Sequence, residues 1–202
     1  MMEKKEHLTQ EGLNNIVAIK SSINKGLAES LKTAFPYIVP VSRPVVRNQV
    51  IRDPYWLAGF ASAEGCFLVN LNTSASHRLG VRIILRFNLS QHSRDEELMR
   101  SLIDYLGCGN AYLRKDGKAI DYQVFNKSDI NKIISFFNKY SILGIKSQDF
   151  YDWCKVNEII IENKGHLTLE GLDEIRKIRA GMNNERNQDS PEGEAAELIR
   201  HK

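Results

Sequence analysis

The sequence predicts an α+β fold in which helices pack on one face of an antiparallel four-stranded sheet, with the element order αββαββα. Two observations carry this prediction. Four stretches, at 66–72, 80–90, 110–114 and 120–125, have the apolar or alternating character of strands and fall into two pairs. Stretches with helical apolar periodicity precede, separate and follow the pairs. Because apolar residues fill one side of the alternating strands, helices should cover that side and leave the other exposed.

The first element is an amphipathic helix that occurs twice. His7–Leu13 (HLTQEGL) returns as His166–Leu172 (HLTLEGL), and 9 of the 18 residues aligned at this offset are identical. We interpret the repeat as the last helix of a folding unit. Residues 7–27 would then be the tail of a preceding unit, and 53–186 a complete unit. The alternative is two similar helices that bracket one domain.

The stretch that follows the first helix should be extended. Pro36, Pro40 and Pro44 recur at four-residue intervals and disfavour a helix. The polar C-terminal stretch, which contains Pro and Gly, should be disordered. The predicted organisation is an N-terminal helix in 1–34, a proline-rich extended linker in 35–52, the main unit in 53–186 and a disordered tail in 187–202.

A short helix is expected from Asp53 to Gly65. The Asp53 side chain can cap free N–H groups, Pro54 suits the first helical position, and Gly65 is a natural stop. The two smallest residues, Gly59 and Ala63, are four apart and share one face. Such a face lets a second helix approach closely.

Glu64 is an acid placed against its electrostatic preference. It lies in the last turn of the expected helix, where the negative end of the macrodipole disfavours a carboxylate. A bound metal cation would reverse the local field, which makes Glu64 a candidate metal ligand. The alternative is a solvated acid at a helix end.

The exposed side of the predicted sheet carries polar side chains at two-residue steps. Arg, Asn and Gln are the side chains that read base edges in the major groove of DNA, so this face is a candidate nucleic-acid interface. The alternative is a sheet face that merely contacts solvent. The candidate DNA-binding residues are Leu68, Asn70, Asn72, Arg82, Ile84, Arg86, Asn88, Asn110, Tyr112, Arg114, Asp121, Gln123 and Phe125.

The remaining helices are predicted from capping residues and apolar stripes. Ser93 with Glu96 forms a capping box, Ser128 and Ser147 are expected caps, and Asp116-Gly117 is expected to form a hairpin turn. The three helices should span about 93–105, 128–139 and 147–162.

Composition sets the broad class of protein. With 28 Lys and Arg against 25 Asp and Glu, the net charge of +3 permits nucleic-acid binding without arguing for it. Three widely spaced cysteines suggest neither a disulfide framework nor a zinc site. No apolar run has membrane-spanning length, so no membrane partner is expected. The N-terminal residues match neither a signal peptide nor a transit peptide.

The stretch Leu57–Gly65 (LAGFASAEG) resembles the nine-residue LAGLIDADG signature of the homing endonucleases. Both glycines, Leu57, two alanines and the acid match, whereas Ser62 replaces an Asp. The element order over 53–186 is that of the LAGLIDADG core fold. With the repeat, the chain resembles the second half and linker of a two-unit, single-chain member of the fungal organelle type.

This resemblance implies a site-specific double-strand DNA endonuclease that hydrolyses phosphodiesters with Mg²⁺ or another divalent cation. Glu64 would bind the metal together with the backbone carbonyl of Ala63. Gln91 would order the attacking water, and Lys146 would steady the water network and developing negative charge. Gly59 and Ala63 would form the helix–helix interface.

The single signature helix implies a second LAGLIDADG unit, supplied by a homodimer or by a complementing half. The alternative function is a non-catalytic nucleic-acid-binding module, either an RNA maturase-like splicing factor or a decayed half-enzyme. Family habit places such proteins in the mitochondrion.

Overall fold

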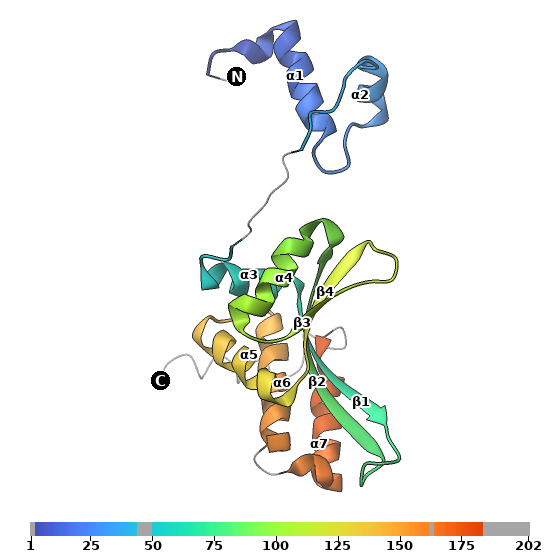
Figure 1. The fold of residues 1–202 in the computed structure, drawn as a ribbon, viewed down its shortest axis with the longest axis vertical. Helices are drawn as coiled ribbons and strands as arrows, with labels where there is room; N and C mark the ends of the chain where they lie inside the picture. The colour runs from blue at the N-terminus through green and yellow to red at the C-terminus, as the bar shows by residue number, and fades with distance from the viewer. Residues whose placement is uncertain (1–2, 44–49, 162–163, 184–202) are drawn as a thin grey trace. The chain divides into compact units, whose positions relative to one another are not determined.

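The computed structural model of the protein describes residues 3–43, 50–161 and 164–183 (Figure 1). The chain divides into two compact units, 1–47 and 48–202. The tail predicted to be disordered, 187–202, lies outside the described residues. Within the described ranges, no helix is long and apolar enough to cross a membrane.

The first unit is helical. It contains a 3₁₀ turn η1 (Glu6–Leu8), helix α1 (Gln10–Ser21) and the short helix α2 (Glu29–Ala34). The sequence had indicated one helix in 1–34, so α2 was missed. Residues 35–43 contain neither helix nor strand. The hydroxyl of Ser22 donates a 2.6 Å hydrogen bond to the carbonyl oxygen of Val41, which holds this stretch against the end of α1.

The second unit contains the predicted four-stranded antiparallel sheet, with the strand order β1-β2-β4-β3. Alternation explains its two faces, because successive side chains of a strand point to opposite sides. Phe87 and Leu89 of β2 and Tyr122 of β4 are fully buried beneath the helices. The strands are β1 (Gly65–Thr73), β2 (Val81–His92), β3 (Asn110–Leu113) and β4 (Ala119–Val124).

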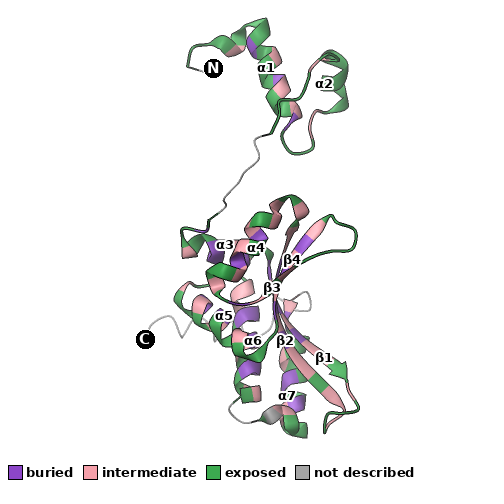
Figure 2. Ribbon diagram, viewed as in Figure 1, coloured by how far each residue is buried: buried purple, intermediate pink, exposed green. Residues whose placement is uncertain are grey.

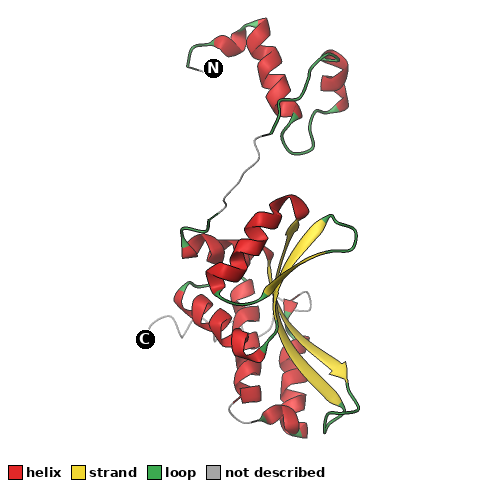
Figure 3. Ribbon diagram, viewed as in Figure 1, coloured by secondary structure: helices red, strands yellow, loops and turns green. Residues whose placement is uncertain are grey.

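Helices cover one face of this sheet, and the unit has the predicted αββαββα order (Figure 3). The core between the two layers is largely aromatic. The ring of Phe67 lies 5.2 Å from that of Phe150 and 5.4 Å from that of Trp153. The helical elements are α3 (Pro54–Glu64), η2 (Ser93–Asp95), α4 (Glu96–Leu106), α5 (Lys127–Lys139), α6 (Lys146–Ile161), η3 (Gly165–Leu167) and α7 (Leu169–Ala180).

The predicted cap of α3 is confirmed, whereas three other predicted helix caps are wrong. The Asp53 carboxylate accepts a 2.9 Å hydrogen bond from the N–H of Tyr55. Ser93 instead begins the 3₁₀ turn η2, because the His92 imidazole caps that turn. The residue before α5 is Asn126, not Ser128. Ser147 lies inside α6 and donates to the carbonyl oxygen of Gly144 at 2.8 Å.

Gly65 ends α3 because its backbone lies too close to Ala61 for a side chain, and not because it adopts the left-handed conformation. Its φ of −69° is accessible to any residue. A Cβ at this position would lie 2.4 Å from the carbonyl oxygen of Ala61, so only glycine fits without a shift. The chain therefore passes directly from the last residue of α3 into β1, and this junction positions Glu64.

Candidate active site

Glu64 is presented at the surface where α3 meets β1. It is the last residue of the helix, and its side chain is exposed. Ala63 is exposed beside it, and a Cβ built on Gly59 would have no atom within 4 Å. In the described residues, the small face of α3 is therefore uncovered, and the acid lies next to it.

Lys146 lies at the same junction. Its Nζ donates a 2.6 Å hydrogen bond to the carbonyl oxygen of Gly65, the residue directly after Glu64. The side chain is half-buried, and it projects from the first residue of α6. Two candidate residues that are far apart in the sequence thus come together.

Ser62, the residue that departs from the signature, fixes the loop that carries Lys146. Its hydroxyl donates to the carbonyl oxygen of Ala58 at 2.7 Å. The Ser62 hydroxyl oxygen in turn accepts a 3.0 Å hydrogen bond from the N–H of Leu143, three residues before Lys146. Sequence reasoning missed this role, and the departure at Ser62 was the signal that pointed to it.

Gln91 lies within β2, whereas the sequence had indicated that it follows this strand. The β1–β2 register pairs Gly65 with Leu89, and Gln91 is two residues beyond Leu89 on the same strand. Gln91 and Leu89 therefore share the face that the helices cover. This places Gln91, which is half-exposed, at the end of the sheet where α3 terminates. No hydrogen bond within the described residues joins it to Glu64 or Lys146.

The strand register brings the candidate DNA-binding residues side by side on the open face of the sheet. Residues that face each other across neighbouring strands project to the same side. Figure 2 shows few buried segments where β1 ends and β2 begins. The facing pairs are Leu68 with Arg86, Asn70 with Ile84, Asn72 with Arg82, Asn88 with Gln123, Asn110 with Gln123, and Tyr112 with Asp121. Phe125 lies one residue beyond β4 and is exposed.

Asp121 on this face has a protein partner. Both of its carboxylate oxygens accept hydrogen bonds from Arg114, at 2.9 Å from Nε and 2.8 Å from Nη2. Hydrogen bonding from Arg114 lowers the pKa of Asp121, and a further bond from Ser90 acts in the same direction against the effect of burial. Asp121 therefore holds the Arg114 guanidinium in a fixed orientation. The guanidinium edge formed by Nε and Nη2 is occupied by this carboxylate.

Two further polar atoms on β2 have no protein partner. Arg86 Nε and Asn88 Oδ1 are buried atoms without a hydrogen bond in the described part of the chain. The amide nitrogen of Asn88, by contrast, donates to the hydroxyl of Ser90 at 2.9 Å. Both residues therefore keep hydrogen-bonding capacity that no partner in the described part of the chain satisfies.

The donor set at the α3–β1 junction limits what the chain can bind alone. Among the described residues, no three His, Cys, Asp or Glu side chains come close enough to hold a metal ion together. One exposed carboxylate, Glu64, remains. Mg²⁺ commonly takes one or two carboxylates and completes its shell with water and phosphate oxygens, so this donor fits it when other ligands are supplied from outside.

Comparison with known proteins agrees with this geometry. The family model of the LAGLIDADG endonuclease matches residues 57–157. The solved structure of the I-SmaMI LAGLIDADG homing endonuclease bound to cleaved DNA is 52% identical, with a TM-score of 0.87 over 92% of this chain and 62% of that chain. The I-LtrWI LAGLIDADG homing endonuclease bound to target DNA is 38% identical, with a TM-score of 0.86 over 92% of this chain and 62% of that chain.

Curated relatives come from fungi. The probable intron-encoded endonuclease 3 of Neurospora crassa is 44% identical over 177 residues, which are 87% of this chain and 33% of that protein. An uncharacterised protein in ND4 intron 1 of Podospora anserina is 34% identical over 57% of this chain and 26% of its own length. The chain spans between about a quarter and a third of the length of these two relatives. The signature helix, the sheet and the match over 57–157 lead to one conclusion: the chain belongs to the LAGLIDADG endonuclease family.

Proposed function

We propose that this chain is one unit of a site-specific double-strand DNA endonuclease that hydrolyses phosphodiesters with a divalent metal. The observation that carries the proposal is the α3–β1 junction. There, an exposed Glu64 lies beside the uncovered Gly59 and Ala63 face, and Lys146 is hydrogen-bonded to the adjoining Gly65.

The metal would be held by Glu64, with the backbone carbonyl of Ala63 as a second oxygen donor. We propose Mg²⁺, because oxygen donors of this kind, few in number, suit it. When bound, the metal would stabilise charge on the scissile phosphate and lower the pKa of a water molecule. A structure of I-SmaMI bound to its uncleaved DNA target was solved in the presence of calcium ions, which supports a divalent-cation site in this family.

The other two residues would act on the water and on charge. Lys146, held at the junction, places a positive charge beside Glu64, where it can stabilise the negative charge that develops during hydrolysis. Gln91 has an amide that can orient a water molecule by accepting and donating hydrogen bonds. Its place at the end of the sheet near α3 supports this role.

Cutting of both strands would require two such acids and therefore two units. The exposed face of α3 includes Trp56, Gly59 and Ala63, at the spacing that lies on one side of a helix. We propose that this face packs against the equivalent helix of a second LAGLIDADG unit. That unit is either another copy of this chain or a complementing half.

DNA would lie on the open face of the sheet. The proposed contacts come from the candidate residues of β1, β2, β3 and β4, with the Arg114 guanidinium held by Asp121. The two DNA-bound neighbours, with TM-scores of 0.87 and 0.86 over most of this chain, support this placement. Relatives from ND4 and cox1 introns support a mitochondrial site of action, which we also propose.

The test is cleavage of a randomised plasmid library by the purified chain in Mg²⁺, with Ca²⁺ as the binding-only condition. We expect double-strand cuts at a defined sequence. Glu64→Gln should retain DNA binding and lose cutting, because the amide is a poor metal ligand. Cutting retained by Glu64→Gln would contradict the assignment. Salt-dependent binding without any cut would exclude a homodimeric endonuclease and leave two possibilities, a complementing half or the non-catalytic module. An RNA substrate would then test for maturase activity.

A further inference from the structure

α1 and α7 are two copies of one structural unit. Each follows a 3₁₀ turn, and their bounds differ by the same offset as the sequence repeat. Thr9 and Thr168 cap the two helices, and each accepts a hydrogen bond from the N–H three residues further on. Left-handed backbone occurs at matching positions, Lys5 and Lys164 before the helices and Asn24 and Asn183 after them. The repeat is therefore structural as well as sequential.

The C-terminal copy buries its apolar face. Leu172, Ile175 and Met182 are 2%, 0% and 3% exposed, and α7 packs against α6 (Figure 2). Ile178 on the same face is partly buried against the core. A helix stabilises a folding unit by burying apolar side chains against the core, and this face of α7 does so.

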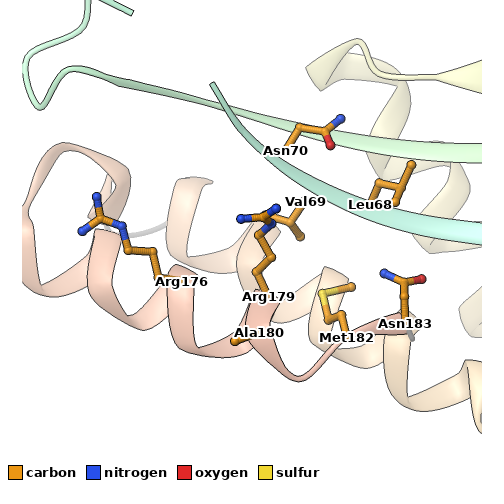
Figure 4. A pocket seen from close by; sticks show the side chains of 8 residues that line it. All are labelled: Leu68, Val69, Asn70, Arg176, Arg179, Ala180, Met182 and Asn183. Atoms are coloured by element: carbon orange, nitrogen blue, oxygen red, sulfur yellow. The ribbon is translucent and has the colours of Figure 1, made fainter. Parts of the chain in front are cut away.

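Asn183 fastens the end of α7 to the edge of the sheet. Its Nδ2 donates to the carbonyl oxygen of Phe67 in β1 at 3.2 Å, and its backbone N–H donates to Asp149 Oδ1 of α6 at 2.9 Å. Figure 4 shows Met182 and Asn183 beside Leu68 of β1, around a pocket of about 340 Å³. We call the part of the unit that α7 covers, formed by α6 and the edge strand β1, the α6–β1 surface.

The N-terminal copy exposes the same face. Leu13, Ile16 and Ile23, the counterparts of Leu172, Ile175 and Met182, are 40%, 37% and 46% exposed. Ile19, the counterpart of Ile178, is 43% exposed. These four large aliphatic side chains, three on one face of α1 and Ile23 just beyond its end, make an exposed apolar patch, which marks an interaction surface.

A side of α1 that adjoins this patch is already covered. Val17 is 6% exposed, and the Ser22 hydroxyl binds the carbonyl oxygen of Val41 in the segment that follows. At the position of Val17, α7 has Arg176, which is exposed. The two helices thus differ in residue character at the position of Val17 and Arg176. Both have apolar residues on the face that α7 buries.

We propose that the apolar face of α1, together with Asn24, binds the α6–β1 surface of a second LAGLIDADG unit. The α6–β1 surface among the described residues of this chain is covered by α7, so the partner is a unit whose own surface is open. This proposal rests on the proposed function, because the partner it names is the second endonuclease unit. It adds an attachment site that is separate from the small face of α3.

The first test places the α1 sequence on the α6–β1 surface of this chain, in the position that α7 occupies. In the full chain, residues 164–183 are replaced by the sequence of residues 5–24, and thermal unfolding is followed by circular dichroism. If α1 fits an α6–β1 surface, the Tm of this chimera should stay within roughly 5 °C of the parent. The matched control is the same transplant with Ile16→Asp and Ile19→Asp, whose Tm should fall by roughly 10 °C or more. A plain transplant that melts as low as this control would overturn the proposal.

The second test measures binding between chains. Leu172→Asp with Ile175→Asp releases α7 and opens the α6–β1 surface, and Gly59→Leu is included to block association through α3. We expect this variant to self-associate in sedimentation, and Ile16→Asp with Ile19→Asp to abolish the association. Association that survives those two changes, or its absence in a variant that keeps its circular dichroism, would count against the proposal. Neither test uses DNA cutting, so a failure of the proposed endonuclease activity leaves both interpretable.

Discussion

The Nζ of Lys146 donates a 2.6 Å hydrogen bond to the main-chain oxygen of Gly65, and Gly65 directly follows Glu64. The bond joins the first residue of α6 to the α3–β1 junction across 81 residues of sequence. A half-buried ammonium group is thereby held one residue from an exposed acid. The start of α6 and the end of α3 consequently form one site.

Replacement of Lys146 by alanine should reduce cutting without loss of folding. Removal of a preorganised positive donor from a site of developing negative charge costs roughly 10²–10³ in rate. Single-turnover cleavage in Mg²⁺ measures this loss, and DNA binding in Ca²⁺ should remain unchanged. Lys155→Ala is the matched control, because Lys155 lies on the same helix and forms an exposed ion pair at 3.8 Å with Glu174. Equal rates for the two variants would contradict the role of Lys146.

Ser62→Ala should lower both stability and cutting. The change removes the acceptor of the Leu143 N–H, and loss of one such hydrogen bond costs about 1 kcal/mol of unfolding free energy. The loop before α6 would also lose its tie to α3, so Lys146 should be held less firmly. Urea unfolding measures the first effect and single-turnover cleavage the second. Ser135→Ala, at an exposed position of α5, should change neither.

The period of the apolar residues made most of this fold predictable. Strict alternation through β2 predicted that Phe87 and Leu89 would be buried, and both are fully buried. The expected Asp116-Gly117 turn is present, with left-handed backbone at Gly117. These features are local, because a side chain's face is set by its position along its own strand.

The errors arise where a contact joins distant residues or where neighbouring polar residues compete. The bond from Leu143 to Ser62 crosses 81 residues and leaves no periodic trace. Ser147, in the first turn of α6, donates its hydroxyl to the carbonyl oxygen of Gly144 in the preceding loop, so the serine was unavailable as the predicted cap.

Asp121→Asn should remove a stabilising contribution that depends on pH. Because Arg114 lowers the pKa of Asp121 in the folded state, the contribution is complete above the unfolded pKa of about 3.9 and is lost as pH falls through the folded pKa. Wild type should be more stable than the variant at pH 7 and at pH 5, and the difference should shrink as the pH falls below about 4. Denaturant unfolding at several pH values measures it. Asp104→Asn, at an exposed position of α4, is the control and should show no such profile.

Gly59→Leu should separate folding from assembly. A Cβ at Gly59 meets nothing within 4 Å, so the isolated chain can accept the larger side chain, and leucine also favours a helix more than glycine does. The leucine would nevertheless fill the space that a second α3 needs for close approach. We expect an unchanged or higher Tm, a loss of the two-unit complex on DNA in sedimentation, and a loss of double-strand cutting. Ser135→Leu adds the same side chain to an exposed position of α5 and should leave assembly intact. If Gly59→Leu assembles and cuts like the parent, the second unit does not pack against this face of α3, and the two acids must be brought together by another surface.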